Sequence, residues 1–205
     1  MPIITSITAQ KNQKRVNIFL NGEYSFSLDL DNFGILGLRA NQELTELEKK
    51  EIIKKGESQK VWDKTLRFVM TRPRSLKEVK DYFRRKQVDA SLHQVILEKM
   101  IKLELLDDQK FAKWWVMQRL EFKNKSKKDI TFELRQKGID TNTIKNILND
   151  SEIDEAKIAK ELINKKSYKW QKYDEKTKKQ KISQYLAGKG FSWDVVDRIV
   201  KSDNI

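Results

Sequence analysis

The 205-residue chain contains no cysteine and only one histidine, His93. Without cysteine it forms no disulfide bond, no thiolate zinc site and no thiol nucleophile. A single histidine removes the usual histidine metal clusters and Ser/His/Asp triads. The glycines match no phosphate-binding loop of the Walker type, so we do not expect this chain to hydrolyse ATP. We accordingly expect no catalytic residue, no metal and no bound cofactor.

Proline and glycine are also scarce, with two and seven residues respectively. Because so few residues break a helix, helix should dominate the fold. No apolar run approaches the roughly 18 residues that span a bilayer, and the N-terminus has neither a basic nor a long apolar segment. These features predict a cytoplasmic protein without a membrane partner.

Positive charge dominates what the chain does contain. It has 43 Lys and Arg against 30 Asp and Glu, a formal net charge of +13. Residues 1–57 hold eight basic and eight acidic side chains, so residues 58–205, with 35 and 22, carry the whole excess. An excess of this size steers association with polyanions. We therefore look for partner-binding residues in the second part of the chain.

Residues 1–57 predict a small β-hairpin module followed by a helix. Apolar and polar residues alternate over residues 16–20 and 24–28, which is typical of half-buried strands. Asn21-Gly22 between them suits the positive φ angles of a two-residue type I′ turn, and residues 3–8 are a candidate third strand. The capping-box pattern Thr45-Glu46-Leu47-Glu48 then predicts a helix over residues 45–56.

The remaining chain predicts three three-helix repeats. Its apolar residues follow helical spacing, and the apolar positions of the first unit recur after 51 and again after a further 52 residues. Both later copies carry a Lys-Gly-apolar corner, in which Gly138 and Gly190 suit the left-handed position at a helix end. The fold class is therefore mainly α, a tandem array of helix-turn-helix-like units. The predicted repeats cover residues 60–106, 108–150 and 152–202.

Several short motifs occur in a characteristic order along the repeats. They are Arg72-Pro73-Arg74-Ser75, Asp107-Asp108 with Phe111-Ala112, Trp114-Trp115-Val116 with Arg119, Glu133-Leu134 with Lys137-Gly138-Ile139, and Tyr185-Leu186 with Gly190-Phe191. In this order and spacing they resemble the RecX family of bacterial recombination regulators. Arg15-Val16-Asn17-Ile18 and Gly22 through Phe26 look like the β-rich extension of its longer members, so the resemblance covers nearly the full chain. The sequence departs from the family pattern at Glu104 and in the turn Asn124-Lys125-Ser126, where family members often have glycine.

The resemblance implies a non-enzymatic regulatory protein with three tandem three-helix repeats. It implies binding to the RecA recombinase filament and restraint of filament assembly, ATP hydrolysis and strand exchange in DNA repair. The expected partners are RecA and single-stranded DNA, reached directly or through the filament. We expect the chain itself to be a monomer.

Basic residues crowd the turns between helices. The turn lysines of the second repeat are Lys123, Lys125, Lys127 and Lys128, and those of the third are Lys172, Lys176, Lys178, Lys179 and Lys181, beside Trp170 and Tyr173. Lysines track phosphates while aromatic rings stack on bases, a combination that suits single-stranded nucleic acid. In the first repeat, Arg72 and Arg74 suit bidentate contacts with phosphate or carboxylate. A solvated surface, or capping of a helix end by the arginines, explains the same residues, so both interpretations stay open.

Other prominent residues have structural interpretations. Trp115 follows Phe111 at helical i, i+4 spacing and is expected in the core, whereas Trp114 points elsewhere and suits inter-repeat packing or a partner. Asp107 and Asp108 are expected to cap the start of a helix.

Two further function classes compete with a filament regulator. A three-helix unit with a short turn also suits a helix-turn-helix transcription factor. The third helices would then present polar base-reading residues, yet they carry mainly apolar side chains, and no dimerisation segment is evident. A basic scaffold that binds RNA or a membrane surface would also use tryptophan and lysine.

Overall fold

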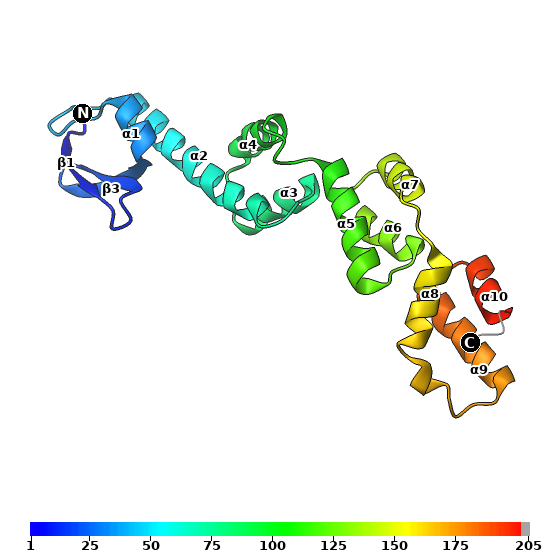
Figure 1. Cartoon of the computed structure of the whole chain (residues 1–205). Coiled ribbons are helices and arrows are strands. Elements are labelled where there is room, and N and C mark those ends of the chain that lie inside the picture. Colours follow the sequence, from blue (N-terminus) through cyan, green and yellow to red (C-terminus); the bar gives the residue numbers. More distant parts are fainter. Residues whose placement is uncertain (202–205) are drawn as a thin grey trace. The chain divides into compact units, whose positions relative to one another are not determined.

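The structure, a computed structural model, describes residues 1–201 and orders them as three strands followed by helices α1 to α10. Figure 1 shows the strands next to the N-terminus and the helices after them in chain order. This order confirms the predicted fold class, a mainly helical array of three-helix repeats after a small β module. The chain divides into two compact units, residues 1–72 with 86–98, and residues 73–85 with the chain from 99 onward.

The N-terminal sheet is antiparallel with the order β1-β2-β3. Strands β1 (Ile4–Ala9), β2 (Arg15–Leu20) and β3 (Glu23–Asp29) precede the short helix α1 (Leu30–Leu36). Asn21 and Gly22, with φ angles of 51° and 89°, form the predicted turn between β2 and β3. The cross-strand pairs Val16↔Leu28 and Ile18↔Phe26 place the alternating apolar residues on one buried face. The hairpin and the third strand are thus confirmed.

Helix α2 (Glu46–Met70) begins with the predicted capping box and is much longer than expected. Thr45 Oγ1 accepts from the Glu48 amide at 3.2 Å, and the Glu48 carboxylate accepts from the Thr45 amide at 2.7 Å. The predicted helix end at residue 56 is wrong, because Gly56 does not break the helix. A Cβ on Gly56 would lie 2.8 Å from Leu28 Cδ2 and 2.9 Å from the Ser27 carbonyl, so this glycine lets α2 approach β3.

The repeats follow in chain order. The first consists of the C-terminal part of α2 with α3 (Leu76–Arg85) and α4 (Ala90–Lys102), and the second of α5 (Asp108–Lys123), α6 (Lys127–Gln136) and α7 (Thr141–Asp150). The third consists of α8 (Glu155–Asn164), α9 (Glu175–Gly188) and α10 (Trp193–Lys201), with a 3-10 turn over Ser167–Lys169. Residue 202, the expected end of the third repeat, lies outside the described residues.

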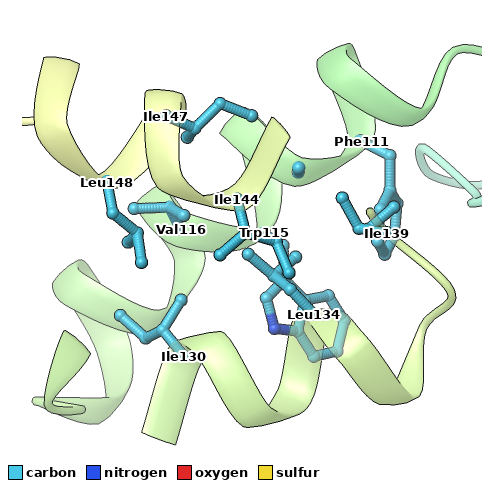
Figure 2. Packing of buried hydrophobic residues seen from close by; sticks show 10 residues of the cluster. Phe111, Trp115, Val116, Ile130, Leu134, Ile139, Ile144, Ile147 and Leu148 are labelled. Atoms are coloured by element: carbon cyan, nitrogen blue, oxygen red, sulfur yellow. The ribbon is translucent and has the colours of Figure 1, made fainter. Parts of the chain in front are cut away.

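The second repeat has its own hydrophobic core, shown in Figure 2. Phe111, Trp115 and Val116 on α5 converge with residues of α6 and α7. Trp115 is 8% exposed, which confirms its predicted place in the core, and Trp114 packs against the same cluster while partly buried. In repeat proteins the interfaces between neighbouring repeats add to the stability of the single repeats, so we expect the junctions to contribute to stability. Over residues 1–201, no helix is both long and apolar enough to cross a membrane.

Candidate polyanion-binding surface of the repeats

The first and second repeats meet at the N-terminus of α3. Ser75 Oγ accepts from the Glu78 amide at 3.2 Å and donates to the carbonyl oxygen of Lys137, at the end of α6, at 2.7 Å. The Leu76 amide, which has no partner inside α3, donates to Asp108 Oδ1 at 2.8 Å. Asp107 caps α5 as predicted, but Asp108 instead holds the start of the preceding repeat's helix.

The second and third repeats meet in the same way at the N-terminus of α6. Ser126 Oγ accepts from the Asp129 amide at 3.2 Å and donates to the carbonyl oxygen of Lys189 at 2.9 Å. The Lys127 amide donates to a Glu155 carboxylate oxygen at 2.9 Å. The spacing of 51 residues between the two serines reproduces the repeat period, so the array uses one junction design twice.

The corner glycines serve these junctions. Gly138 and Gly190 have φ angles of 82° and 79°, which confirms the predicted left-handed conformation. A Cβ on Gly138 would lie 2.7 Å from Lys77 Cβ, and one on Gly190 would lie 2.8 Å from Ser126 Oγ. Gln87 occupies the equivalent corner of α3 with a φ of 51° and an exposed side chain. Glycine is thus required at these two corners for two reasons. It tolerates the positive φ, and it leaves room for the preceding repeat that packs on the corner.

The turn lysines of the second repeat divide into two groups. Lys125 is half-buried and pairs with Asp129 at 2.9 Å and with Glu133 at 3.6 Å. Its hydrogen bond with Asp129 raises the pKa of Lys125 above the ordinary value. Lys123 and Lys128 have exposed side chains, and among residues 1–201 neither pairs with a carboxylate. Lys127 is half-buried at the first position of α6, where its amide belongs to the junction.

Glu133 organises the surface beside Lys125. Its Oε2 accepts from Trp115 Nε1 at 2.9 Å and also from Arg119 Nε. The Arg119 guanidinium lies 3.8 Å from the Trp115 ring centroid, and Lys137 lies 5.0 Å from the same centroid. Arg119, Lys125 and Lys137 are therefore committed to intramolecular contacts and hold α5 and α6 together.

The basic cluster of the third repeat surrounds a tyrosine. Lys172 and Lys181 lie 5.4 and 4.7 Å from the ring centroid of Tyr173, which is half-buried. Trp170 is 6% exposed and packs at 5.4 Å between centroids against Tyr185, so its ring belongs to the core of this repeat rather than to a stacking surface. The remaining lysines of the cluster are exposed at Lys176 and half-buried at Lys178 and Lys179.

The predicted binding residues of the first repeat are two arginines. Arg72 and Arg74 are both half-buried at the turn around Pro73. In the described part of the chain, no group of three or more His, Asp or Glu side chains is arranged to hold a metal ion.

Sequence reasoning missed the outward face of α6. Phe132 is 61% exposed, and Lys128 and Arg135, one turn before and after it, are exposed as well. The signal in the sequence was the position of Phe132 halfway between Ile130 and Leu134, which are both fully buried. A residue two positions from each of them on a helix points away from the core.

Comparison with known proteins reproduces the module and the repeats. The family model described as regulatory protein RecX N-terminal domain matches residues 2–45. The models described as the second and third three-helix domains of RecX match residues 107–148 and 153–200. These ranges correspond to the β module and to the second and third repeats.

Whole-chain relatives carry the same name. The regulatory protein RecX of Bacillus licheniformis is 39% identical over 198 residues, which cover 96% of this chain and 75% of that protein. The regulatory protein RecX of Bacillus subtilis is 35% identical with the same coverage. A crystal structure of regulatory protein RecX superposes with a TM-score of 0.76 at 27% identity, covering 98% of this chain and 100% of that one. The crystal structure of RecX from Lactobacillus salivarius has a TM-score of 0.63 at 28% identity, covering 71% of this chain and 95% of that one. The family models match the β module and two of the repeats, and the relatives match 96% of the chain. The chain therefore belongs to the RecX family of regulatory proteins.

Proposed function

We propose that this chain binds the RecA filament on single-stranded DNA and restrains its assembly, ATP hydrolysis and strand exchange. The observation that carries the proposal is the match to regulatory proteins named RecX over 96% of the chain. Binding to a protein-coated nucleic acid also suits the net charge of +13, because cations attract the phosphates and acidic groups of such a filament.

The regulation we propose is non-enzymatic. The chain has no cysteine, one histidine and no phosphate-binding glycine loop, so it offers no evident route to act on ATP itself. Any change in ATP hydrolysis would then follow from contact with RecA. Inhibition and filament affinity should therefore decrease together in a series of variants.

The lysines best placed to meet a polyanion are the exposed ones without an internal carboxylate. Among the turn lysines of the second repeat these are Lys123 and Lys128. Lys125 has the same charge but is held by Asp129 and Glu133, so freeing it for a partner costs two ion pairs within the repeat. Substitution of the exposed lysines should therefore affect partner binding, whereas substitution of Lys125 should affect stability.

The experiment compares three variants in binding to RecA-coated single strands over a salt series. Lys123→Ala with Lys128→Ala should weaken binding and reduce the slope of log affinity against log salt by about 0.7 for each phosphate that the variant no longer neutralises. Lys11→Ala with Lys14→Ala removes the same charge from exposed positions of the β module and should leave the slope unchanged. Lys125→Ala should mainly lower the melting temperature. A wild-type chain that neither binds the RecA-coated strand nor slows ATP hydrolysis by RecA would refute the proposed function.

A further inference from the structure

The outward face of α6 combines an exposed aromatic ring with two unneutralised cations. Lys128, Phe132 and Arg135 follow one another at i, i+4 and i+7 and therefore lie on one side of the helix. Phe132 is 61% exposed, and neither cation pairs with a carboxylate among residues 1–201. The stem of Lys128 lies at the junction with the third repeat, since its Cβ is 3.6 Å from the position of a Cβ on Gly190.

The equivalent face of α3 has the same two cations but a different central residue. The fully buried pair Val79 and Phe83 corresponds to Ile130 and Leu134, 51 residues later. In this register, Lys77, Asp81 and Arg84 occupy the positions of Lys128, Phe132 and Arg135.

Asp81 pairs with both Lys77 and Arg84 in α3. Its carboxylate accepts from Lys77 Nζ at 3.0 Å and also from Arg84. These contacts lower the pKa of Asp81, chiefly through the hydrogen bond from Lys77, while desolvation opposes the change. The presence of phenylalanine in α6, where α3 has an acid, thus leaves the cations of α6 available to a partner.

The third repeat lacks the arrangement altogether. With the next shift of 52 residues, the same face of α9 carries Gln180, Gln184 and Ala187. The combination of a ring with two available cations is therefore specific to the second repeat among these three equivalent faces.

We propose that Lys128, Phe132 and Arg135 form a binding site for single-stranded nucleic acid, in which Phe132 stacks on a base and the two cations contact phosphates on either side. The inference rests on the proposed function, because it identifies where the chain would touch the DNA strand. An aromatic face binds any base, whereas the cations bind the backbone, so the site recognises single strands without sequence preference. In a duplex the bases remain stacked on one another, so only the phosphates are available to this site.

The first test separates base stacking from charge. Full-length wild type and Phe132→Ala are titrated with an oligothymidylate and with an abasic strand that has the same number of phosphates. Loss of the ring should weaken binding to the oligothymidylate about fivefold or more, with no change in salt slope or in affinity for the abasic strand. Phe122→Ala is the matched control. Phe122 is 62% exposed in the same repeat, but Arg119 and Lys125, three residues to either side, are held by Glu133 and Asp129.

The second test converts the α6 face into the α3 face. Phe132→Asp places a carboxylate between Lys128 and Arg135, as Asp81 lies between Lys77 and Arg84. It should remove the stacking contribution and also reduce the salt slope by about 0.7, since the carboxylate neutralises one of the two positive charges. All of the substituted positions are exposed, so helical content and melting temperature should match wild type and exclude misfolding as the cause.

Three results would overturn the inference. One is an equal effect of Phe132→Ala on the oligothymidylate and the abasic strand, because the ring would then contact no base. Another is an effect of Phe132→Ala that Phe122→Ala reproduces. The third is an effect confined to RecA-coated strands, which would make this face a protein-binding surface. Because bare oligonucleotides are titrated without RecA, failure here remains distinct from failure of the proposed filament binding.

Discussion

The hydroxyl of Ser75 donates a hydrogen bond to the carbonyl oxygen of Lys137 at 2.7 Å. The serine that precedes the second helix of one repeat thereby holds the end of the next repeat's second helix, 62 residues away in sequence. Ser126 repeats the contact with Lys189. This bond satisfies a carbonyl at a helix end that has no partner inside its own helix, so the junction and the two helix ends stabilise one another.

Gly138→Asn tests whether the corner glycine is required by packing as well as by its φ angle. Asparagine tolerates the left-handed region, but its Cβ would still lie 2.7 Å from Lys77 Cβ, which is fixed to the α3 backbone. We expect a loss of at least about 1 kcal/mol of unfolding free energy, measured by urea denaturation. Gln87→Asn, at the exposed corner of the first repeat, should have no measurable effect. Equal effects of the two substitutions would contradict the packing role.

Ser126 substitutions separate helix capping from the bond between repeats. Ser126→Ala removes both and should lower the unfolding free energy by roughly 1–2 kcal/mol. Ser126→Asp keeps an acceptor for the Asp129 amide but has no proton to donate to the Lys189 carbonyl, so it should also destabilise. Ser192 caps α10 from an exposed position, with its Oγ 3.4 Å from the Val195 amide, and Ser192→Ala should cost less. Full stability of Ser126→Asp in urea would show that the bond between repeats contributes nothing.

Two residues with left-handed backbone should respond oppositely to glycine. Glu104 and Asn124 have φ angles of 54° and 48°, which glycine adopts without strain. Glu104→Gly should raise the melting temperature, because the exposed pair that Glu104 forms with Lys110 contributes little. Asn124→Gly should lower it, because the buried Asn124 side chain donates to Glu161 at 2.7 Å and accepts from Lys165 at 2.7 Å. A rise for both variants in thermal melts would contradict the structural role of the Asn124 side chain.

Asp108→Asn tests the carboxylate at the first junction. Burial raises the pKa of Asp108, with Asp107 and Asp140 adding to the rise while the Leu76 amide and Lys80 oppose it. The folded state therefore binds the Asp108 proton more tightly than the unfolded chain does, and the contribution of this group to stability falls as pH rises through the window above its ordinary pKa of 3.8.

Asparagine keeps an oxygen for the Leu76 amide and removes the buried charge. We expect the melting temperature of Asp108→Asn, relative to wild type, to be highest near neutral pH. The difference should shrink as the pH is lowered and Asp108 takes up its proton. A difference that grows on acidification would reverse the assigned direction of the pKa shift.

The sequence was sufficient wherever structure depends on neighbours in the chain. Asn21-Gly22 forms the hairpin turn because both residues adopt positive φ, and Thr45 with Glu48 caps α2 through bonds between residues three apart. The corner glycines were also found from sequence, through their fixed place after a periodic helix. The same local reasoning ended α2 too early, because the approach of Gly56 to Leu28 involves residues far apart in the chain.

Tertiary structure decided which side chains remain available to a partner. Lys125 and Lys128 look alike in a lysine-rich turn, yet one is held by Asp129 and Glu133 while the other is exposed. Trp170 lies among lysines in the sequence, but its ring is buried against Tyr185. A charge or a ring is neutralised or covered by groups that the fold brings near, often from other helices. The sequence therefore determined the repeats and their helix ends, whereas the folded structure determined which of these cations are paired and which of these rings are covered by other helices.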